Sequence, residues 1–194
     1  MKTYQVITPA STYPVSLTEA KSHLKVDTTA DDTYITSIIK AATQLSEEYT
    51  NRFFIDTEIE QYASSFVELK TLFKSKVSAI TNVKYYDNNN TLQVLSATVY
   101  NTQLNYEPSQ IQLAENQSFP SITKRNDAVR AKYTVGYGSS ASDVPEIIKQ
   151  AILLTIGNFY QNRNSVVIGR IATELPMNVK WLLDTYKVQI VGWQ

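Results

Sequence analysis

Apolar residues recur at helical spacing in two segments near the start of the chain. A capping-box pattern at residues 16–19 precedes the first segment, so the spacing predicts a short helix over residues 17–25. A second helix is predicted to begin at Asp31 or Asp32 and to end at Asn51, because Asn suits a left-handed helix stop. Its stripe follows the i, i+3, i+4, i+7 rule and comprises Ile35, Ile38, Ile39, Ala42, Leu45 and Tyr49.

Between residues 55 and 137 the pattern changes to short runs of β-branched and aromatic residues with partial alternation of apolar and polar positions. Such runs are typical of β-strands. The runs are Ile55–Tyr62, Val67–Phe73, Ile80–Tyr86, Leu92–Leu95, Val99–Leu104, Gln110–Leu113 and Val129–Val135. The segment Asp87–Asn90 predicts a hairpin turn, because Asp and Asn tolerate positive φ. The region therefore predicts an antiparallel β unit.

Helical spacing returns after a Gly- and Ser-containing link at residues 136–142. Asp143 and Glu146 predict the start of a third helix, whose apolar residues cover more than one face, so it is expected to be central. The helical pattern stops after Arg163, and Pro176 opens a last helix with an apolar stripe. That stripe consists of Val179, Leu182, Leu183 and Tyr186.

The order of these elements predicts an α+β fold in which an antiparallel β unit is inserted into a helical body. The N- and C-terminal helices must meet in space, because neither group alone can bury its apolar faces. The expected parts are residues 1–54 for the N-terminal helical part, 55–137 for the β unit, and 138–194 for the C-terminal helices and tail.

Composition removes several classes of function. The 194 residues contain no cysteine, which excludes disulfides, thiol nucleophiles and Cys-type zinc sites. Lys plus Arg and Asp plus Glu both number 18, with no long run of one sign, so tight nucleic-acid binding by a monomer is not expected. No signal segment and no apolar run of about 18 residues is present, which predicts a protein made in a cytoplasm, with no membrane partner.

Candidate catalytic groups are few. His23 is the single histidine and has no second ligand for a metal, so no metal or cofactor is expected. The paired acids at 31–32 and 47–48 fit a helix cap and a solvated face better than catalysis. The sequence thus favours a protein that is not an enzyme. An acid-dependent hydrolase using Glu47 or Glu48 stays open as an alternative, as does a small DNA-binding module built on the second helix.

Features near the C-terminus point to contacts with other chains. Tyr160 and Arg163 lie one helical turn apart, where they can cap a helix end or form a polar contact between subunits. The 13 tyrosines against six phenylalanines also suit buried contact surfaces. The apolar tail with Val188, Ile190 and Trp193 is expected to dock on a partner, since an isolated monomer gains little from it.

Several segments share a pattern with one family along nearly the whole chain. They are Pro14–Lys21 with Leu24 and Asp27, Tyr49–Arg52, Val77–Asp87, Pro145–Ile152, Asn158–Arg163, and Leu175–Pro176 before Leu182–Tyr186. In this order they resemble the phage head-tail connector family, the adaptor proteins that sit under the portal ring of tailed bacteriophages.

The resemblance implies a structural protein of the virion at the portal-tail junction, made in the host bacterial cytoplasm. Its copies would form a homo-oligomeric ring, a dodecamer set by the portal, whose lumen passes double-stranded DNA transiently during packaging and ejection. The portal protein and a tail or stopper protein would be its partners. The C-terminal part would engage the portal, so Tyr186 and Lys187 join Tyr160, Arg163 and the tail as expected contact residues.

Overall fold

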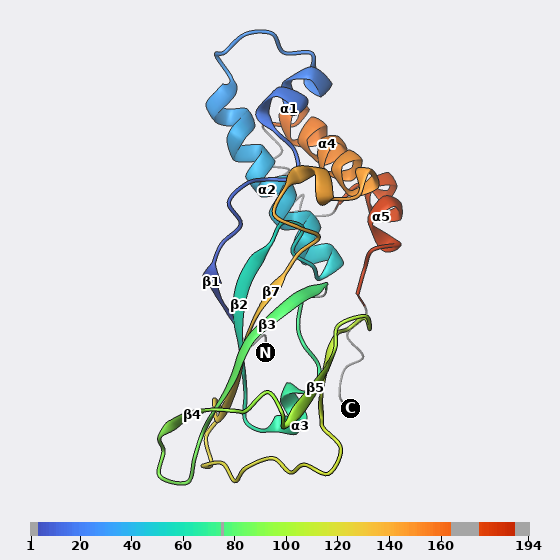
Figure 1. Ribbon diagram of the computed structural model, residues 1–194. Helices are drawn as coiled ribbons and strands as arrows, with labels where there is room; N and C mark the ends of the chain where they lie inside the picture. Colours follow the sequence, from blue (N-terminus) through green and yellow to red (C-terminus); the bar gives the residue numbers. More distant parts are fainter. Residues whose placement is uncertain (1–3, 75, 164–174, 189–194) are drawn as a thin grey trace, which may run out of the picture. The chain divides into compact units, whose positions relative to one another are not determined.

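A computed structural model of the chain describes residues 4–74, 76–163 and 175–188. The α+β fold class predicted from the sequence is confirmed (Figure 1). Contacts divide the chain into two compact units. The helical unit comprises Thr12–Thr50 and Ser140–Lys187, and the β unit comprises Met1–Ser11, Asn51–Ser139 and Val188–Gln194. The start of the chain therefore lies with the β unit, although residues 1–54 were expected to form one helical part.

The N-terminal half of the helical unit contains α1 (Leu17–Leu24) and α2 (Asp32–Thr50). The predicted capping box is present at α1, because the Ser16 hydroxyl accepts the Glu19 N–H at 3.2 Å and the Glu19 carboxylate accepts the Ser16 N–H at 2.7 Å. Asn51, with φ of 55°, ends α2 in the left-handed conformation, as predicted.

The C-terminal half contains a short 3₁₀ turn, η1 (Ala141–Asp143), followed by α4 (Glu146–Gln161) and α5 (Met177–Asp184). Helix α4 packs on α1, α2 and α5 and is central, as the spread of its apolar residues predicted (Figure 1). It buries Ile148, Ala151, Ile152, Thr155 and Ile156. Two segments that the 89 residues Asn51–Ser139 separate in the sequence thus share one helical core.

The β unit is built on a five-stranded antiparallel sheet with strand order β1-β2-β7-β3-β4. These strands are β1 (Tyr4–Thr8), β2 (Thr57–Ala63), β7 (Val129–Val135), β3 (Val77–Tyr86) and β4 (Leu92–Val94). A second sheet pairs β5 (Tyr100–Gln103) with β6 (Gln110–Leu113). The turn predicted at Asp87–Asn90 joins β3 and β4, with the Asn90 N–H bonded to the Asp87 carbonyl at 2.9 Å.

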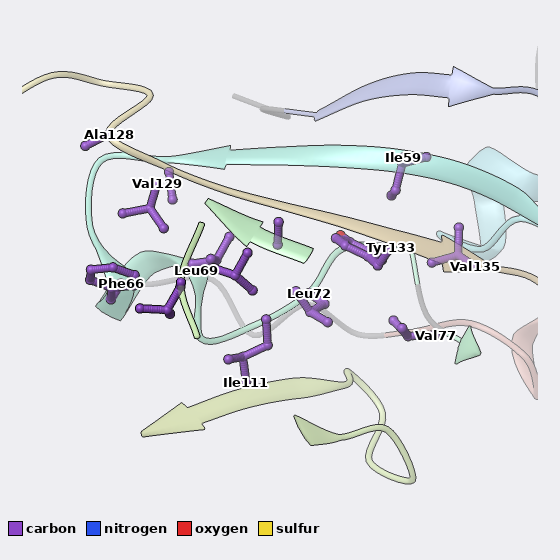
Figure 2. Close-up of a cluster of buried hydrophobic side chains, with 14 residues drawn as sticks. Ile59, Phe66, Leu69, Leu72, Val77, Ile111, Ala128, Val129, Tyr133 and Val135 are labelled. Atoms are coloured by element: carbon purple, nitrogen blue, oxygen red, sulfur yellow. The ribbon is translucent and has the colours of Figure 1, made fainter. Parts of the chain in front are cut away.

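One face of the five-stranded sheet forms the core of the β unit. Residues of β2 and β7 alternate strictly between buried and half-buried positions, and the two strands pair without a register shift. Figure 2 shows Phe66, Leu69 and Leu72 gathered with Ile111 of β6 in the same buried cluster as Tyr133. The Tyr133 hydroxyl donates to the side-chain oxygen of Gln61 at 2.6 Å, so its polar end is satisfied inside the core.

Two local predictions were wrong or incomplete. The run Val67–Phe73 was predicted as a strand, but Phe66–Leu69 forms the short helix α3, capped by the Ser65 hydroxyl that accepts the Glu68 N–H at 3.3 Å. Phe66 and Leu69 are three positions apart, so one helical turn directs both into the core. Strand β1 was not predicted, because its residues are mostly exposed and show no alternating burial.

Candidate interaction site

The end of α4 meets the start of α2 in a polar and aromatic group. The Tyr160 hydroxyl donates to Asp31 Oδ2 at 2.6 Å, and Arg163 Nη2 donates to the same oxygen at 2.8 Å. The Arg163 guanidinium carbon lies 4.5 Å from the ring centroid of Tyr34 and 4.4 Å from that of Tyr160. We call Asp31, Tyr34, Tyr160 and Arg163 the Asp31 cluster. The structure thus brings together two predicted contact residues and adds Asp31, which directly precedes α2, and Tyr34 of α2.

Hydrogen bonds and charge pairing determine the protonation states in the Asp31 cluster. Hydrogen bonds from Arg163 and Tyr160 lower the pKa of Asp31, while the hydrogen bond to Asp31 raises the pKa of Tyr160. At neutral pH the cluster therefore holds a carboxylate, a guanidinium and a neutral phenol. The Arg163 side chain remains 43% exposed, so part of its guanidinium can meet a further acceptor.

A second group joins the end of α5 to the end of α2. The Tyr49 hydroxyl donates to Asp184 Oδ1 at 2.5 Å, and this hydrogen bond raises the pKa of Tyr49. Lys187 Nζ lies 4.4 Å from the centroid of the Tyr49 ring. Lys187, one of the predicted contact residues, is thus engaged within its own chain. These contacts fix the point from which the C-terminal tail departs.

The remaining predicted contact residues lie at or beyond this point. Tyr186 is half-buried, and its N–H donates to the Leu183 carbonyl at 2.9 Å. Val188 is buried. Ile190 and Trp193 lie outside the described residues.

Helix α5 exposes two large apolar residues that the sequence reasoning missed. Met177 and Trp181 are 70% and 71% exposed, whereas Val179 and Leu183 of the same helix are fully buried. Residues four apart lie on one helix face, so Met177 and Trp181 form an outward pair. The signal was available in the sequence, since these two apolar residues fall outside the stripe that contains Val179 and Leu183.

The residues considered for chemistry occupy structural positions. Glu48 is exposed and Glu47 is half-buried on the last turns of α2. The His23 ring lies 3.5 Å from where a Cβ on Gly157 would stand, so it packs against α4. Across residues 4–74, 76–163 and 175–188, no group of three or more His, Asp or Glu side chains is placed to hold a metal ion. None of the described helices is both long and apolar enough to cross a membrane.

Comparison with known proteins gives a family match and a shared fold. Residues 14–117, more than half of the chain, match the family model described as phage gp6-like head-tail connector protein. A search of curated proteins found no match. Among solved structures, a chain in the neck of the empty GTA particle computed with C6 symmetry is 18% identical, with a TM-score of 0.76 over 98% of both chains.

Two further solved structures show the same fold. A chain in the virion of the native gene transfer agent (GTA) particle is 20% identical, with a TM-score of 0.76 over 98% of both chains. A chain in the neck of the native GTA particle computed with C12 symmetry is also 20% identical, with a TM-score of 0.74. That alignment covers 100% of the present chain and 98% of the other. The similarity therefore includes both compact units.

Proposed function

The chain belongs to the phage gp6-like head-tail connector family and is a structural connector of a virion, and from this premise we propose that twelve copies form a ring. The ring joins the portal protein to a tail or stopper protein and lets double-stranded DNA pass through its lumen. The observation that supports this most is the fold match, over the full length of the chain, to a protein of a neck with C12 symmetry.

The charge of the chain agrees with a channel that DNA crosses. With 18 basic and 18 acidic residues, the formal net charge is zero. A strongly basic lumen would neutralise phosphates and hold the DNA, because counterion release makes each such contact favourable. A near-neutral ring guides DNA without retaining it. The connector role needs no catalytic group, which agrees with the positions of Glu47 and Glu48 on a helix surface.

The C-terminal part is proposed to dock on the portal. Asp184 and Lys187 hold the end of α5 on Tyr49, so the tail starts from a fixed point on the helical unit. An apolar tail leaving a fixed point is suited to filling a groove of a partner, because less freedom is lost on binding. Ile190 and Trp193 supply its large apolar side chains.

The Asp31 cluster is proposed to contact a neighbouring subunit. Its carboxylate orients Arg163 from within the chain, while the exposed part of the guanidinium keeps donors available for an acceptor on the neighbour. Arg and Tyr are enriched at protein interfaces for this reason. Tyr160 and Arg163 would thus join the end of α4 to the start of α2 within one copy and also contact the neighbouring copy in the ring.

Removing residues 189–194 tests the docking step. The truncated protein keeps Lys187 and the buried Val188, so its thermal unfolding should match that of the full chain. In a pull-down with the portal protein it should lose binding, while a control variant at an exposed site of the β unit, Tyr106→Ser, should bind normally. Full binding by the folded truncated protein would contradict portal docking through the tail.

A further inference from the structure

Helices α4 and α5 pack on each other and both direct apolar side chains outward. Met177 and Trp181 of α5 are the most exposed large apolar side chains in the described part of the chain, and Ile147 of α4 is 46% exposed. We call Ile147, Met177 and Trp181 the α4–α5 face. A tryptophan usually buries most of its large surface, so one left mostly in water is unusual for a protein that acts alone.

The part of α4 that follows Lys149 lacks charge. Between Lys149 and Arg163, helix α4 contains no charged residue, and its Leu153 and Leu154 are only half-buried. The outer side of a solvent-facing helix ordinarily carries charged residues. Depletion of charge together with exposed Trp and Met is the composition found at the centre of protein interfaces. These properties favour a protein surface as the occupant of this face.

Charge also indicates which protein covers it. The segments Thr12–Thr50 and Ser140–Lys187 contain eight Lys or Arg and ten Asp or Glu, so the helical unit has a net charge of −2. Identical helical units placed side by side in a ring repel one another weakly, and a lateral contact is therefore favoured where neither copy brings charge. Every copy in a closed ring needs such a contact with its neighbours.

We infer that the α4–α5 face of each copy is covered by the helical unit of a neighbouring copy. The inference rests on the proposed ring and adds the surface through which its subunits meet. A ring contact is heterologous, so the face packs on a different surface of the neighbour and residue 177 does not meet residue 177 of the next copy. Trp181, which is 71% exposed, supplies the largest apolar side chain of this contact.

Site-specific photo-crosslinking tests the inference. A photoreactive amino acid replaces Met177 in an equal mixture of ¹⁴N- and ¹⁵N-labelled copies that are assembled on the portal protein. The expected product joins position 177 to a peptide from residues 12–50 or 140–187, with both isotopes present in one linked pair. As a control, the photoreactive amino acid replaces Val67, which is 65% exposed on α3. This protein should not form a crosslink to the helical unit of a neighbouring copy.

The outcomes separate this inference from the proposed function. If the protein assembles as a ring on the portal but position 177 links only to a portal or tail peptide, or only within one copy, the inference is wrong and the connector function stands. If no ring assembles on the portal, the proposed function fails and the inference fails with it.

A pair of matched variants gives a second measurement. Trp181→Ser removes an exposed side chain, so the melting temperature should not change, whereas the amount of assembled ring at a given concentration should fall by about tenfold or more. Val67→Ser removes a similarly exposed side chain from the β unit and should leave ring assembly unchanged. Normal assembly of the folded Trp181→Ser protein would overturn the inference.

Discussion

The two units of the chain place their aromatic and apolar side chains differently. The β unit buries Tyr133 and Phe66 in a continuous core, while the helical unit leaves Trp181 and Met177 mostly in water. The β unit also exposes apolar residues, among them Val67 on α3 and Leu92 and Val94 on β4, but none of the described ones is as exposed as Met177 or Trp181. Met177 and Trp181 share one face of one helix. We therefore expect the contact between copies to lie on the helical unit.

Charges are also arranged differently in the two units. On the polar face of the sheet, Lys132 pairs with Glu58 at 2.9 Å across β7 and β2, and Arg130 pairs with Asp127 at 3.2 Å. Lys132 and Arg130 thus find oppositely charged partners within the β unit. In the helical unit, Arg163 is bonded to Asp31 yet stays partly exposed. The β unit is thus a self-contained scaffold, and variants in its core are expected to show the largest effects on stability.

Tyr133→Ala should give the largest loss of stability. The side chain is fully buried and hydrogen-bonded to Gln61, and truncating a buried aromatic residue costs about 3–5 kcal/mol. Denaturant unfolding followed by circular dichroism measures the change. Tyr106→Ala, at a position 60% exposed, is the control and should change the free energy of unfolding by less than about 0.5 kcal/mol. A similarly small change in the free energy of unfolding for both variants would contradict the role of the β unit as a scaffold.

Two glycine substitutions should have opposite effects in the two units. Gly136 has a φ of 152°, and a Cβ there would lie 2.6 Å from the Asp56 nitrogen, so Gly136→Ala should destabilise the β unit by about 1–3 kcal/mol. Gly157 lies inside α4, where a Cβ would meet only the His23 ring at 3.5 Å. Gly157→Ala should be neutral or stabilising by up to about 1 kcal/mol. Thermal unfolding of both variants shows whether each substitution lowers or raises the stability. Equal destabilisation by the two substitutions would contradict the expected difference between Gly136 and Gly157.

A smaller, pH-dependent effect is expected from the Asp31 cluster. The pKa of Asp31 is lowered in the fold by Arg163 and Tyr160, so its contribution to stability is present above the unfolded Asp pKa of about 3.9. That contribution is lost as the pH falls through the lower folded pKa. The melting temperature of Asp31→Asn should therefore lie below that of the wild type at pH 7 and approach it below about pH 4.

The control for this effect is Asp27→Asn, because Asp27 is exposed and is not part of the Asp31 cluster. At pH 7 its melting temperature should lie closer to that of the wild type than the melting temperature of Asp31→Asn does. A difference between Asp31→Asn and the wild type that is the same at acid and neutral pH would show that the carboxylate charge is not what stabilises the α2–α4 junction.

The sequence predicted elements whose signals are local. The capping box before α1, the long stripe of α2 and the turn at Asp87–Asn90 each depend on residues close together in the chain, and each is confirmed. Helix α3 had a local signal as well, since Ser65 and Glu68 have capping spacing, but the apolar run Val67–Phe73 favoured a strand. Short apolar runs fit both structures, so periodicity alone does not separate them.

The interaction site was predictable only in part. Tyr160 and Arg163 were found because they lie one turn apart on one helix, but Asp31 lies 132 residues from Arg163 and was interpreted as a helix cap. Pairing across such a separation follows from the tertiary fold and leaves no local pattern. Lys187 was expected to face a partner, and the structure shows in addition that its ammonium lies over the Tyr49 ring of its own chain. Strand β1 was missed for the related reason that an edge strand with exposed residues lacks alternation.

Electron cryomicroscopy of the protein bound to its portal would show directly whether the copies form a ring. We expect a coaxial ring of twelve copies on the portal, with the helical units in lateral contact through α4 and α5 and a DNA-sized channel along the axis. A complex in which single copies decorate the portal without touching one another, or the absence of any complex, would contradict it.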